Sequence, residues 1–413
     1  MTEPTVAPYG SWASPFPIER MTEGVVFVSE VRGADGVRWW LEGRPEEQGR
    51  QVLVRRDPDG STTRLTPEGF NARTRVHEYG GAATLVSGEL IVVSDFATGR
   101  LQRVTAPGQL APLTPERAWR FADFVHDPAQ ERLIAVREDH EPDVVAEHGE
   151  WVNELVTIDL ATGAVEVIAK GADFYSAPRL SPDGRHLCWL EWNHPNLPWD
   201  GTRLQLAAVG EGGGLGPATT IAGSARDWVS QPRWSPDGVL HFVAEPDGWM
   251  NLFRYHGGVV QPIAPMAVEF GSPDWVFGIA EYGFLDDGGL LAVGRSGGRD
   301  RLYRIRPDGA ASVIDLPYTE IGSVDVDGRT AILRAVSPFE PAVAVDLDIE
   351  TGAIEVLRRA TPFIADPADV SAPRHVEFPS IGGRTAHANL YAPHNASFRA
   401  PDGELPPLIV TSH

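Results

Sequence analysis

The stretch YSAPRLSPDGRHLCWLEW, residues 175–192, has a close copy in SQPRWSPDGVLHFVAEPDG, residues 230–248. Each copy reads as a polar strand, a Ser-Pro-Asp-Gly turn and a second strand with apolar residues at alternate positions. Proline presets the backbone of such a turn and glycine supplies its positive φ, so each copy predicts a β-hairpin of fixed register. A chain of 413 residues with a recurring hairpin predicts a repeat architecture.

Weaker copies of the hairpin occur along the chain, for example in residues 124–139, 282–305 and 323–337. Each is followed by a second hairpin, such as LVTIDLATGAVEVIAKG at 155–171, and four short strands per unit are typical of a propeller blade. We predict an all-β, seven-bladed β-propeller over residues 12–360, after an N-terminal segment 1–11, with blades beginning near residues 12, 80, 120, 174, 230, 276 and 320. A pair of β-sandwiches is the alternative.

The last part of the chain departs from the repeat. Residues 361–373, TPFIADPADVSAP, are rich in Pro, Ala and Asp and predict a linker. Residues 374–413 predict a hairpin about Gly382 and Gly383, followed by a buried strand at 408–410. We expect these residues to be the first strands of a different domain that the sequence does not complete.

Composition limits the classes of partner. The formal charge of -22 disfavours nucleic acid and anionic membrane surfaces as partners. Cys188 is the single cysteine, so neither an internal disulfide nor a cysteine-based zinc cage is possible, and its strand-like surroundings predict a core position. We find no signal-peptide pattern and no run long enough to span a membrane, so we expect a cytoplasmic location.

Several motifs resemble the prolyl oligopeptidase family of serine peptidases, in its dipeptidyl aminopeptidase and acylaminoacyl-peptidase branch. The motifs are TRVHEYGG (74–81), VREDH (136–140), WNHPNLPWDGT (192–202), the Ser-Pro-Asp-Gly turns and VEFPSIGGRTAHANLY (376–391). The resemblance implies a propeller followed by an α/β-hydrolase domain, with His413 as the first residue of the loop that forms the oxyanion hole. It also implies that the catalytic Ser, Asp and His lie outside this sequence, so we expect no peptidase activity from residues 1–413.

A five-residue match to the G-x-S-x-G motif of serine hydrolases occurs at GRSGG, residues 294–298. The motif needs a helix after the serine, whereas RDRLYRIRPDG predicts a strand and a turn. We therefore place Ser296 in a hairpin and exclude it as the nucleophile.

Two acidic residues at the end of the strand RLIAV are candidates for substrate binding. Glu138 and Asp139 lie beside Arg137 and His140, and the resemblance implies that a carboxylate here binds the α-ammonium group of a peptide. A salt-bridged loop between blades is the alternative. The motif HEYGG contributes a second set of candidates, namely His77, Glu78 and Tyr79. We expect these residues either to face a central channel or to satisfy backbone groups at a blade junction.

The aromatic and proline-rich insertion at 192–202 predicts a rigid rim that meets the hydrolase domain, through Trp192, Asn193, His194 and Trp199. We assign no metal, because the spacing of His140, Glu141 and Asp143 matches no loop of defined coordination, and no cofactor. The expected partners are a short peptide and the hydrolase domain, and homo-oligomerisation stays open. A non-catalytic propeller resembling the TolB type, acting as a binding module, is the alternative function.

Overall fold

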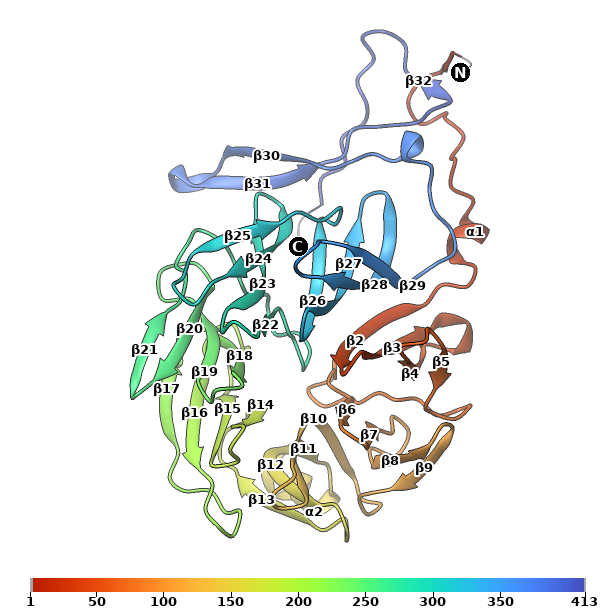
Figure 1. The fold of residues 1–413 in the computed structure, drawn as a ribbon. Helices are drawn as coiled ribbons and strands as arrows, with labels where there is room; N and C mark the ends of the chain where they lie inside the picture. The colour runs from red at the N-terminus through yellow and green to blue at the C-terminus, as the bar shows by residue number, and fades with distance from the viewer. Residues whose placement is uncertain (1–2, 412–413) are drawn as a thin grey trace.

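The computed structural model describes residues 3–411 as a ring of β-sheets around a central channel (Figure 1). Within these residues, seven four-stranded sheets form the ring and two two-stranded sheets lie outside it. The predicted all-β, seven-bladed propeller is therefore confirmed. No helix in residues 3–411 is long and apolar enough to cross a membrane.

Each blade consists of four consecutive strands paired in antiparallel order, and the first strands of neighbouring blades adjoin around the channel. Blades 1 and 2 contain β2 (Phe27–Ala34), β3 (Val37–Arg44), β4 (Arg50–Arg56), β5 (Thr62–Arg64), β6 (Thr84–Ser87), β7 (Leu90–Ser94), β8 (Leu101–Ala106) and β9 (Gln109–Pro112). Blades 3 and 4 contain β10 (Trp119–Asp127), β11 (Arg132–Asp139), β12 (Val152–Asp159), β13 (Val165–Ala169), β14 (Phe174–Leu180), β15 (His186–Trp192), β16 (Arg203–Ala208) and β17 (Thr219–Gly223). Blades 5 to 7 contain β18 (Val229–Trp234), β19 (Leu240–Ala244), β20 (Asn251–His256), β21 (Val259–Pro262), β22 (Tyr282–Phe284), β23 (Leu290–Ser296), β24 (Arg299–Ile305), β25 (Ala311–Ile314), β26 (Glu320–Asp327), β27 (Thr330–Ser337), β28 (Glu340–Asp348) and β29 (Ile354–Arg359).

Blade 1 begins later than the sequence predicted. Its first strand starts at Phe27 instead of near residue 12, and the short helix α1 (Ile18–Thr22) precedes it. Pro15 and Pro17 lack the N–H group that strand pairing needs, which explains why this stretch does not join the sheet. The other six blades begin at strands close to the predicted positions.

A repeated bulge shapes the innermost strands. In β2, β10, β14 and β18 the register shifts, and one residue at the shift has a left-handed backbone, namely Glu30 (φ 48°), Asp123 (φ 53°), Ala177 (φ 49°) and Gln231 (φ 52°). The side chains of Glu30, Asp123 and Gln231 at these bulges form hydrogen bonds toward the next blade. Glu30 accepts a hydrogen bond from Ala83 N at 2.9 Å, and Asp123 accepts one from Ala177 N at 2.8 Å. The bulges thus link successive blades around the channel.

The ring closes without exchange of a strand, because blades 1 and 7 are each built from consecutive strands. Apolar side chains of blade 1, such as Trp40, pack against Ile332 of blade 7. Arg38 of blade 1 forms ion pairs with Asp327 at 2.6 Å and Asp346 at 3.1 Å on blade 7. Side-chain packing and ion pairs therefore hold the seam between the first and last blades.

Two small sheets lie outside the ring. β1 (Thr5–Val6) pairs in parallel with β32 (Phe398–Arg399), so residues 398–399 adjoin the N-terminal strand at one edge of the molecule (Figure 1). β30 (Arg374–Pro379) and β31 (Thr385–Leu390) form the predicted hairpin, whose tip is the 3-10 turn η3 (Ile381–Gly383). The segment 361–373 contains the 3-10 turn η2 (Pro367–Asp369).

The predicted buried strand at 408–410 is wrong. Leu408, Ile409 and Val410 have no strand conformation and are 77%, 85% and 79% exposed. No strand within residues 3–411 pairs with them, and an apolar segment without a pairing partner has no sheet in which to be buried.

One face of the ring carries the longer loops, and we call it the loop face. In a four-stranded meander the loop between the second and third strands and the connection to the next blade leave at the same end of the blade. The loop face therefore carries the connections 65–83 and 263–281, and the loops 140–151, with α2 (Pro142–His148), and 193–202. The β30–β31 hairpin lies at this face too, because Asn389 donates to the carbonyl oxygen of Gly298, in the turn between β23 and β24, at 3.4 Å.

Candidate functional site

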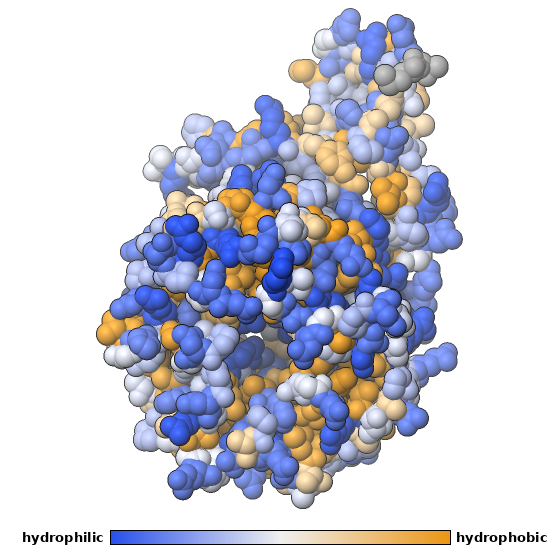
Figure 2. Space-filling model, in the orientation of Figure 1, coloured by the Kyte–Doolittle hydropathy of each residue, from blue (hydrophilic) through white to orange (hydrophobic). Residues whose placement is uncertain are grey.

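The central channel holds a cavity of about 680 Å³. Figure 2 shows the ring hollowed at its centre, with apolar side chains gathered around the lower part of the hollow. Four parts of the loop face line the cavity, at 77–80, Trp151, 194–199 and 274–280, together with Trp192 and residues of the innermost strands. This volume and this lining are typical of a site for a small molecule or a short peptide.

The HEYGG loop is held in an unusual backbone conformation. His77 and Glu78 have φ of 52° and 67°, and Gly80 and Gly81 follow at 70° and 98°. Successive left-handed residues other than glycine cost energy and persist only where neighbouring structure fixes them. Here Glu138 of blade 3 accepts a hydrogen bond from His77 N at 2.7 Å.

The same loop meets the connection that leads into blade 6. Phe277 N donates to Gly80 O at 2.9 Å, and Gly81 forms an isolated parallel bridge with Phe277. Blades 2 and 6 are not neighbours in the ring, so the two connections bridge part of the channel mouth at the loop face. A Cβ atom on Gly81 would lie 2.5 Å from Phe277 O, which explains why glycine occupies this position.

Aromatic rings surround this bridge. The imidazole of His77 lies 4.6 Å from the ring of Phe277 and 5.4 Å from that of Trp192, measured between ring centroids. Further along the mouth, Trp275 lies 5.7 Å from Tyr79 and 4.6 Å from Trp199. The cavity mouth therefore offers aromatic surfaces in edge-to-face and tilted arrangements, of the kind that bind aromatic side chains or cationic groups.

The His77 imidazole is enclosed by these rings. Burial lowers the pKa of His77 to about 4, against the opposing effect of the Glu138 carboxylate. Its Nε2 atom is buried and has no hydrogen-bond partner among the described residues. His77 is therefore a neutral ring that packs in the mouth near neutral pH.

Glu78 is the acidic residue best placed to contact a ligand. Its side chain is exposed and lines the cavity, and it forms no hydrogen bond or ion pair with residues 3–411. Tyr79, next in sequence, is 63% exposed and also lines the cavity. The rigid loop thus presents a carboxylate and a phenol ring at the channel mouth.

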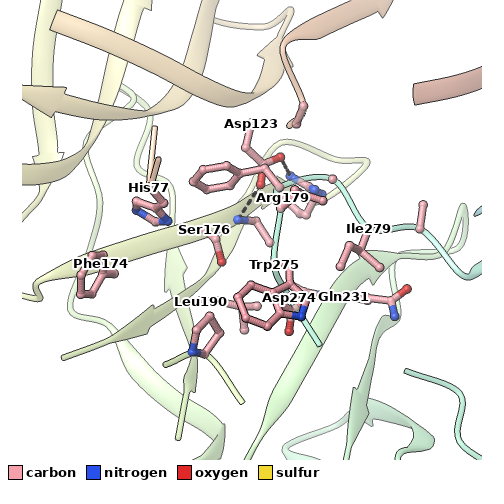
Figure 3. A pocket seen from close by; sticks show the side chains of 18 of the residues that line it. His77, Asp123, Phe174, Ser176, Arg179, Leu190, Gln231, Asp274, Trp275 and Ile279 are labelled. Atoms are coloured by element: carbon pink, nitrogen blue, oxygen red, sulfur yellow. Dashed lines mark hydrogen bonds and ion pairs between the residues drawn. The ribbon is translucent and has the colours of Figure 1, made fainter. Parts of the chain in front are cut away.

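The inner wall of the cavity is charged and largely paired. Asp123 and Arg179 form an ion pair at 2.7 Å, and Figure 3 shows this pair, with His77 and Phe174 to its left. Asp274, also drawn there, accepts hydrogen bonds from Ser230 at 2.6 Å and from Trp228. Burial raises the pKa of Asp274 to about 6 despite these two bonds.

The acidic pair proposed from VREDH lies elsewhere. Glu138 is 1% exposed, and besides His77 N it contacts Arg120 at 3.4 Å and His140 Nε2 at 2.9 Å. Asp139 is 7% exposed and pairs with Arg137 at 3.2 Å. Both carboxylates are thus engaged by ion pairs within blade 3, and the hydrogen bond from His77 N is the contact that Glu138 makes outside this blade.

The remaining two residues of that motif are also packed against the protein. Arg137 is buried, pairs with Glu154 and lies over the ring of Trp119 at 4.5 Å. His140 stacks on Trp151, with ring centroids 5.2 Å apart, and lines a separate, smaller cavity. Neither residue lines the channel cavity.

Three of the four rim residues predicted in the 192–202 insertion line the cavity, namely Trp192, His194 and Trp199. Asn193 instead accepts a hydrogen bond from Asp173 N at 2.8 Å and anchors the loop. Sequence reasoning missed the aromatic contribution of Phe174, Trp275 and Phe277. The signal was present in PDWVFG, residues 273–278, which resembles no turn of the repeat and lies in an unusually long connection.

Two further sequence assignments concern catalysis. Ser296 is the last residue of β23, and the turn at Gly297 and Gly298 leads directly into β24, so the expected hairpin position is correct. The hydroxyl of Ser296 accepts a hydrogen bond from Arg301 at 3.1 Å. His413 lies outside the described residues.

Comparison with solved structures identifies similar proteins. A puromycin-hydrolysing peptidase of Mycobacterium tuberculosis is 33% identical, covers 97% of this chain and 64% of its own, and superposes with a TM-score of 0.89. A puromycin hydrolase is 30% identical, with 98% and 64% covered and a TM-score of 0.85. A prolyl endopeptidase shares the fold at 14% identity, with 89% and 55% covered and a TM-score of 0.67. No family model and no curated protein matches the chain.

The fold and the channel define a propeller of the kind that peptidases carry. The alignment with peptidase structures extends over nearly the whole chain, including the hairpin after the last blade. The chain corresponds to the propeller portion of these peptidases, which supports the predicted resemblance to the prolyl oligopeptidase family. It spans 64% of the length of the puromycin-hydrolysing relatives.

Proposed function

We propose that this chain is the propeller of a cytoplasmic serine peptidase that hydrolyses short peptides, of the dipeptidyl aminopeptidase or acylaminoacyl-peptidase type. The propeller restricts access to small substrates and binds their N-terminal end in the channel mouth. The hydrolase domain that would carry the nucleophile covers the loop face. The observation that carries the proposal is the free carboxylate of Glu78 among aromatic rings at that face.

Charge and geometry support Glu78 as the group that binds the substrate's α-ammonium. Its carboxylate has no partner within residues 3–411, whereas Glu138 and Asp139 are buried and paired. A hydrogen bond to a charged group contributes about 1.5–3 kcal/mol. Tyr79 and Trp275 lie beside it, and their rings suit the apolar part of a first residue.

The position of the 374–390 hairpin supports the loop face as the docking surface of the hydrolase domain. The hairpin contacts the Gly298 turn at this face, and exposed apolar side chains follow in the hairpin tip and beyond it, including Ile381 at 84% and Leu405 at 86%. The relatives bear on the substrate class, because their names describe a peptidase and a hydrolase that act on puromycin.

The test is Glu78→Gln in the peptidase that contains this propeller. We expect the Michaelis constant for substrates with a free N-terminus to rise about tenfold to a hundredfold, and that for N-acetylated substrates to change little. Glu89→Gln is the matched control, because Glu89 is exposed in the turn between β6 and β7, away from the loop face. An equal rise in the Michaelis constant for free and N-acetylated substrates, or no rise for either, would contradict the proposed role of Glu78.

For residues 1–413 alone we propose that there is no turnover of chromogenic aminoacyl or dipeptidyl substrates. Ser296 lies at a strand end and contacts Arg301, and no histidine within residues 3–411 bonds to its hydroxyl. Turnover by this chain that disappears on Ser296→Ala would refute the proposal.

A further inference from the structure

The β30–β31 hairpin brings together three side chains with metal-binding groups. Glu377 on β30 is directly opposite His387 on β31, and His375 lies two residues before Glu377 on the same face of the strand. Sequence spacing alone does not reveal this group, because its members come from two strands. The described residues contain this one group of three or more such side chains in which all the ligand atoms lie within 4.8 Å of one another.

The three ligand atoms form a nearly regular triangle. His387 Nδ1 lies 3.3 Å from His375 Nε2, and Glu377 Oε1 lies 3.5 Å from each of these nitrogen atoms. In tetrahedral zinc sites the metal lies about 2.0–2.2 Å from nitrogen and oxygen ligands, so neighbouring ligand atoms are about 3.3–3.5 Å apart. The triangle therefore has the size of one face of a zinc coordination tetrahedron.

The chemistry of the three groups suits a divalent transition metal. Two imidazoles and one carboxylate are ligands that zinc takes in proteins. The second nitrogen of His375, Nδ1, is buried and has no hydrogen-bond partner among the described residues. Coordination through Nε2 would place the proton on Nδ1, so Nδ1 does not compete for the metal.

Pairwise contacts without a metal explain the arrangement less well. Glu377 and His387 are 60% and 57% exposed at their side chains, and exposed ion pairs contribute only about 0–1 kcal/mol. Between the two imidazoles, one nitrogen must donate and the other accept, so this contact fails once both rings are protonated. A metal ion satisfies all three ligand atoms together.

We propose that His375, Glu377 and His387 bind one divalent transition metal ion of the zinc class, with a fourth position left to water or to a group from outside the hairpin. The ion would join the two strands next to the turn of blade 6. A Cβ atom on Gly298 would lie 2.9 Å from His375 Nδ1, so the glycine permits the close approach of the hairpin to the ring. Metal binding would then stiffen the hairpin at the loop face.

The test is titration of the chelator-treated 413-residue chain with Zn²⁺ by calorimetry, with Co²⁺ absorption as a second probe. We expect one site per chain, and an affinity at least about tenfold weaker in His387→Ala and in Glu377→Gln. His256→Ala is the control, since His256 is exposed on blade 5, and it should bind as the unchanged chain does. Melting curves establish that the variants are folded.

Unchanged Zn²⁺ affinity in both hairpin variants would overturn the site, as would equal weakening by His256→Ala. Hydrogen exchange provides a readout of the stiffening. Zn²⁺ should slow exchange of the amides in residues 375–389 of the unchanged chain and not in His387→Ala. Equal exchange with and without Zn²⁺ would overturn the stiffening.

Discussion

Asp123 shows how a single residue joins two blades and the channel wall. It is 3% exposed, adopts a left-handed backbone, accepts the Ala177 N–H and pairs with Arg179. Asp123→Ala removes both contacts and leaves a buried N–H and a cation without partners, so we expect a loss of about 3 kcal/mol in the free energy of unfolding. Urea unfolding measures it.

Asp123→Asn is the matched comparison for this prediction. Asparagine tolerates the left-handed backbone and keeps an oxygen for the Ala177 N–H. The asparagine variant should therefore lose less free energy of unfolding than the alanine variant. Alanine and asparagine variants of equal stability would show that neither the N–H bond nor the conformation matters at this bulge.

His77 predicts a pH dependence of stability. Its folded-state pKa of about 4 is below the usual value of 6.5, because burial disfavours the charged ring. Between these two values the unfolded chain binds more protons, so stability is full above about pH 6.5 and decreases as the pH falls toward 4. We expect His77 to contribute on the order of 2–3 kcal/mol to this decrease.

The measurement is urea unfolding between pH 7 and 4 for the unchanged chain and for His77→Asn, since asparagine suits the left-handed backbone. The variant should show a flatter decrease with falling pH, whatever its absolute stability. His256→Asn, at an exposed position, should keep the slope of the unchanged chain. Identical slopes in all three proteins would be evidence against a buried neutral His77.

At the level of single residues, sequence reasoning found two motifs that are in contact and favoured a carboxylate, Glu138, that the fold buries and pairs. HEYGG and VREDH are in contact, because Glu138 holds the backbone of His77. Both motifs contain acidic residues that the sequence alone would place at the surface. Glu138 is the buried one, and it accepts a hydrogen bond from a residue 61 positions away in the sequence. The sequence contains no local signal for that contact, which holds the left-handed residue His77.

At the level of elements, hairpins were predictable and loops were not. The residues of each Ser-Pro-Asp-Gly turn fix the backbone conformation of the turn locally. The two strands predicted within 175–192 are therefore present in the structure. The connections 65–83 and 263–281 fold against each other across the channel, through the bridge of Gly81 and Phe277. Such contacts depend on the closed ring, which explains why they were not foreseen.

That bridge gives a prediction about a loop pair. Gly81→Ala would place a Cβ atom against Phe277 O in a backbone conformation with φ of 98°, so we expect a loss of about 2–4 kcal/mol and a looser channel mouth. Gly88→Ala is the control, because Gly88 also has positive φ but nothing lies within 4 Å of the added atom. It should lose about 1 kcal/mol.

The difference between the two glycine variants isolates the contact from the backbone strain. Thermal unfolding measures stability, and limited proteolysis followed by mass spectrometry detects opening between residues 65 and 83. If Gly81→Ala is cleaved no faster than Gly88→Ala, the two connections do not hold each other in solution.

At the scale of the whole molecule, seven blades must close into a ring, and the seam between blades 1 and 7 lacks a shared strand. Residues from both blades share an apolar cluster there, which includes Trp40 and Ile332. Beside it, Asp327 also accepts hydrogen bonds from the backbone of Asp35 and Gly36. Carboxylates of blade 7 thus contact the backbone and the Arg38 side chain of blade 1.

Arg38 is the cation of this seam, and its loss should open the ring. Its side chain is 5% exposed and pairs with Asp327 and Asp346, which are 20% and 21% exposed. Arg38→Met keeps most of the packing but leaves two carboxylates near each other without a cation, so we expect a loss of about 3 kcal/mol. Arg329→Met is the control, because the Arg329 side chain is 70% exposed and 3.5 Å from Asp348, and it should change the free energy of unfolding by less than about 0.5 kcal/mol.

Hydrogen exchange should accelerate in β2 and β26 of the Arg38 variant, while β14 of blade 4 keeps its protection. Uniform acceleration in every blade would instead mean that the ring unfolds as one unit and that the seam is not its weakest point.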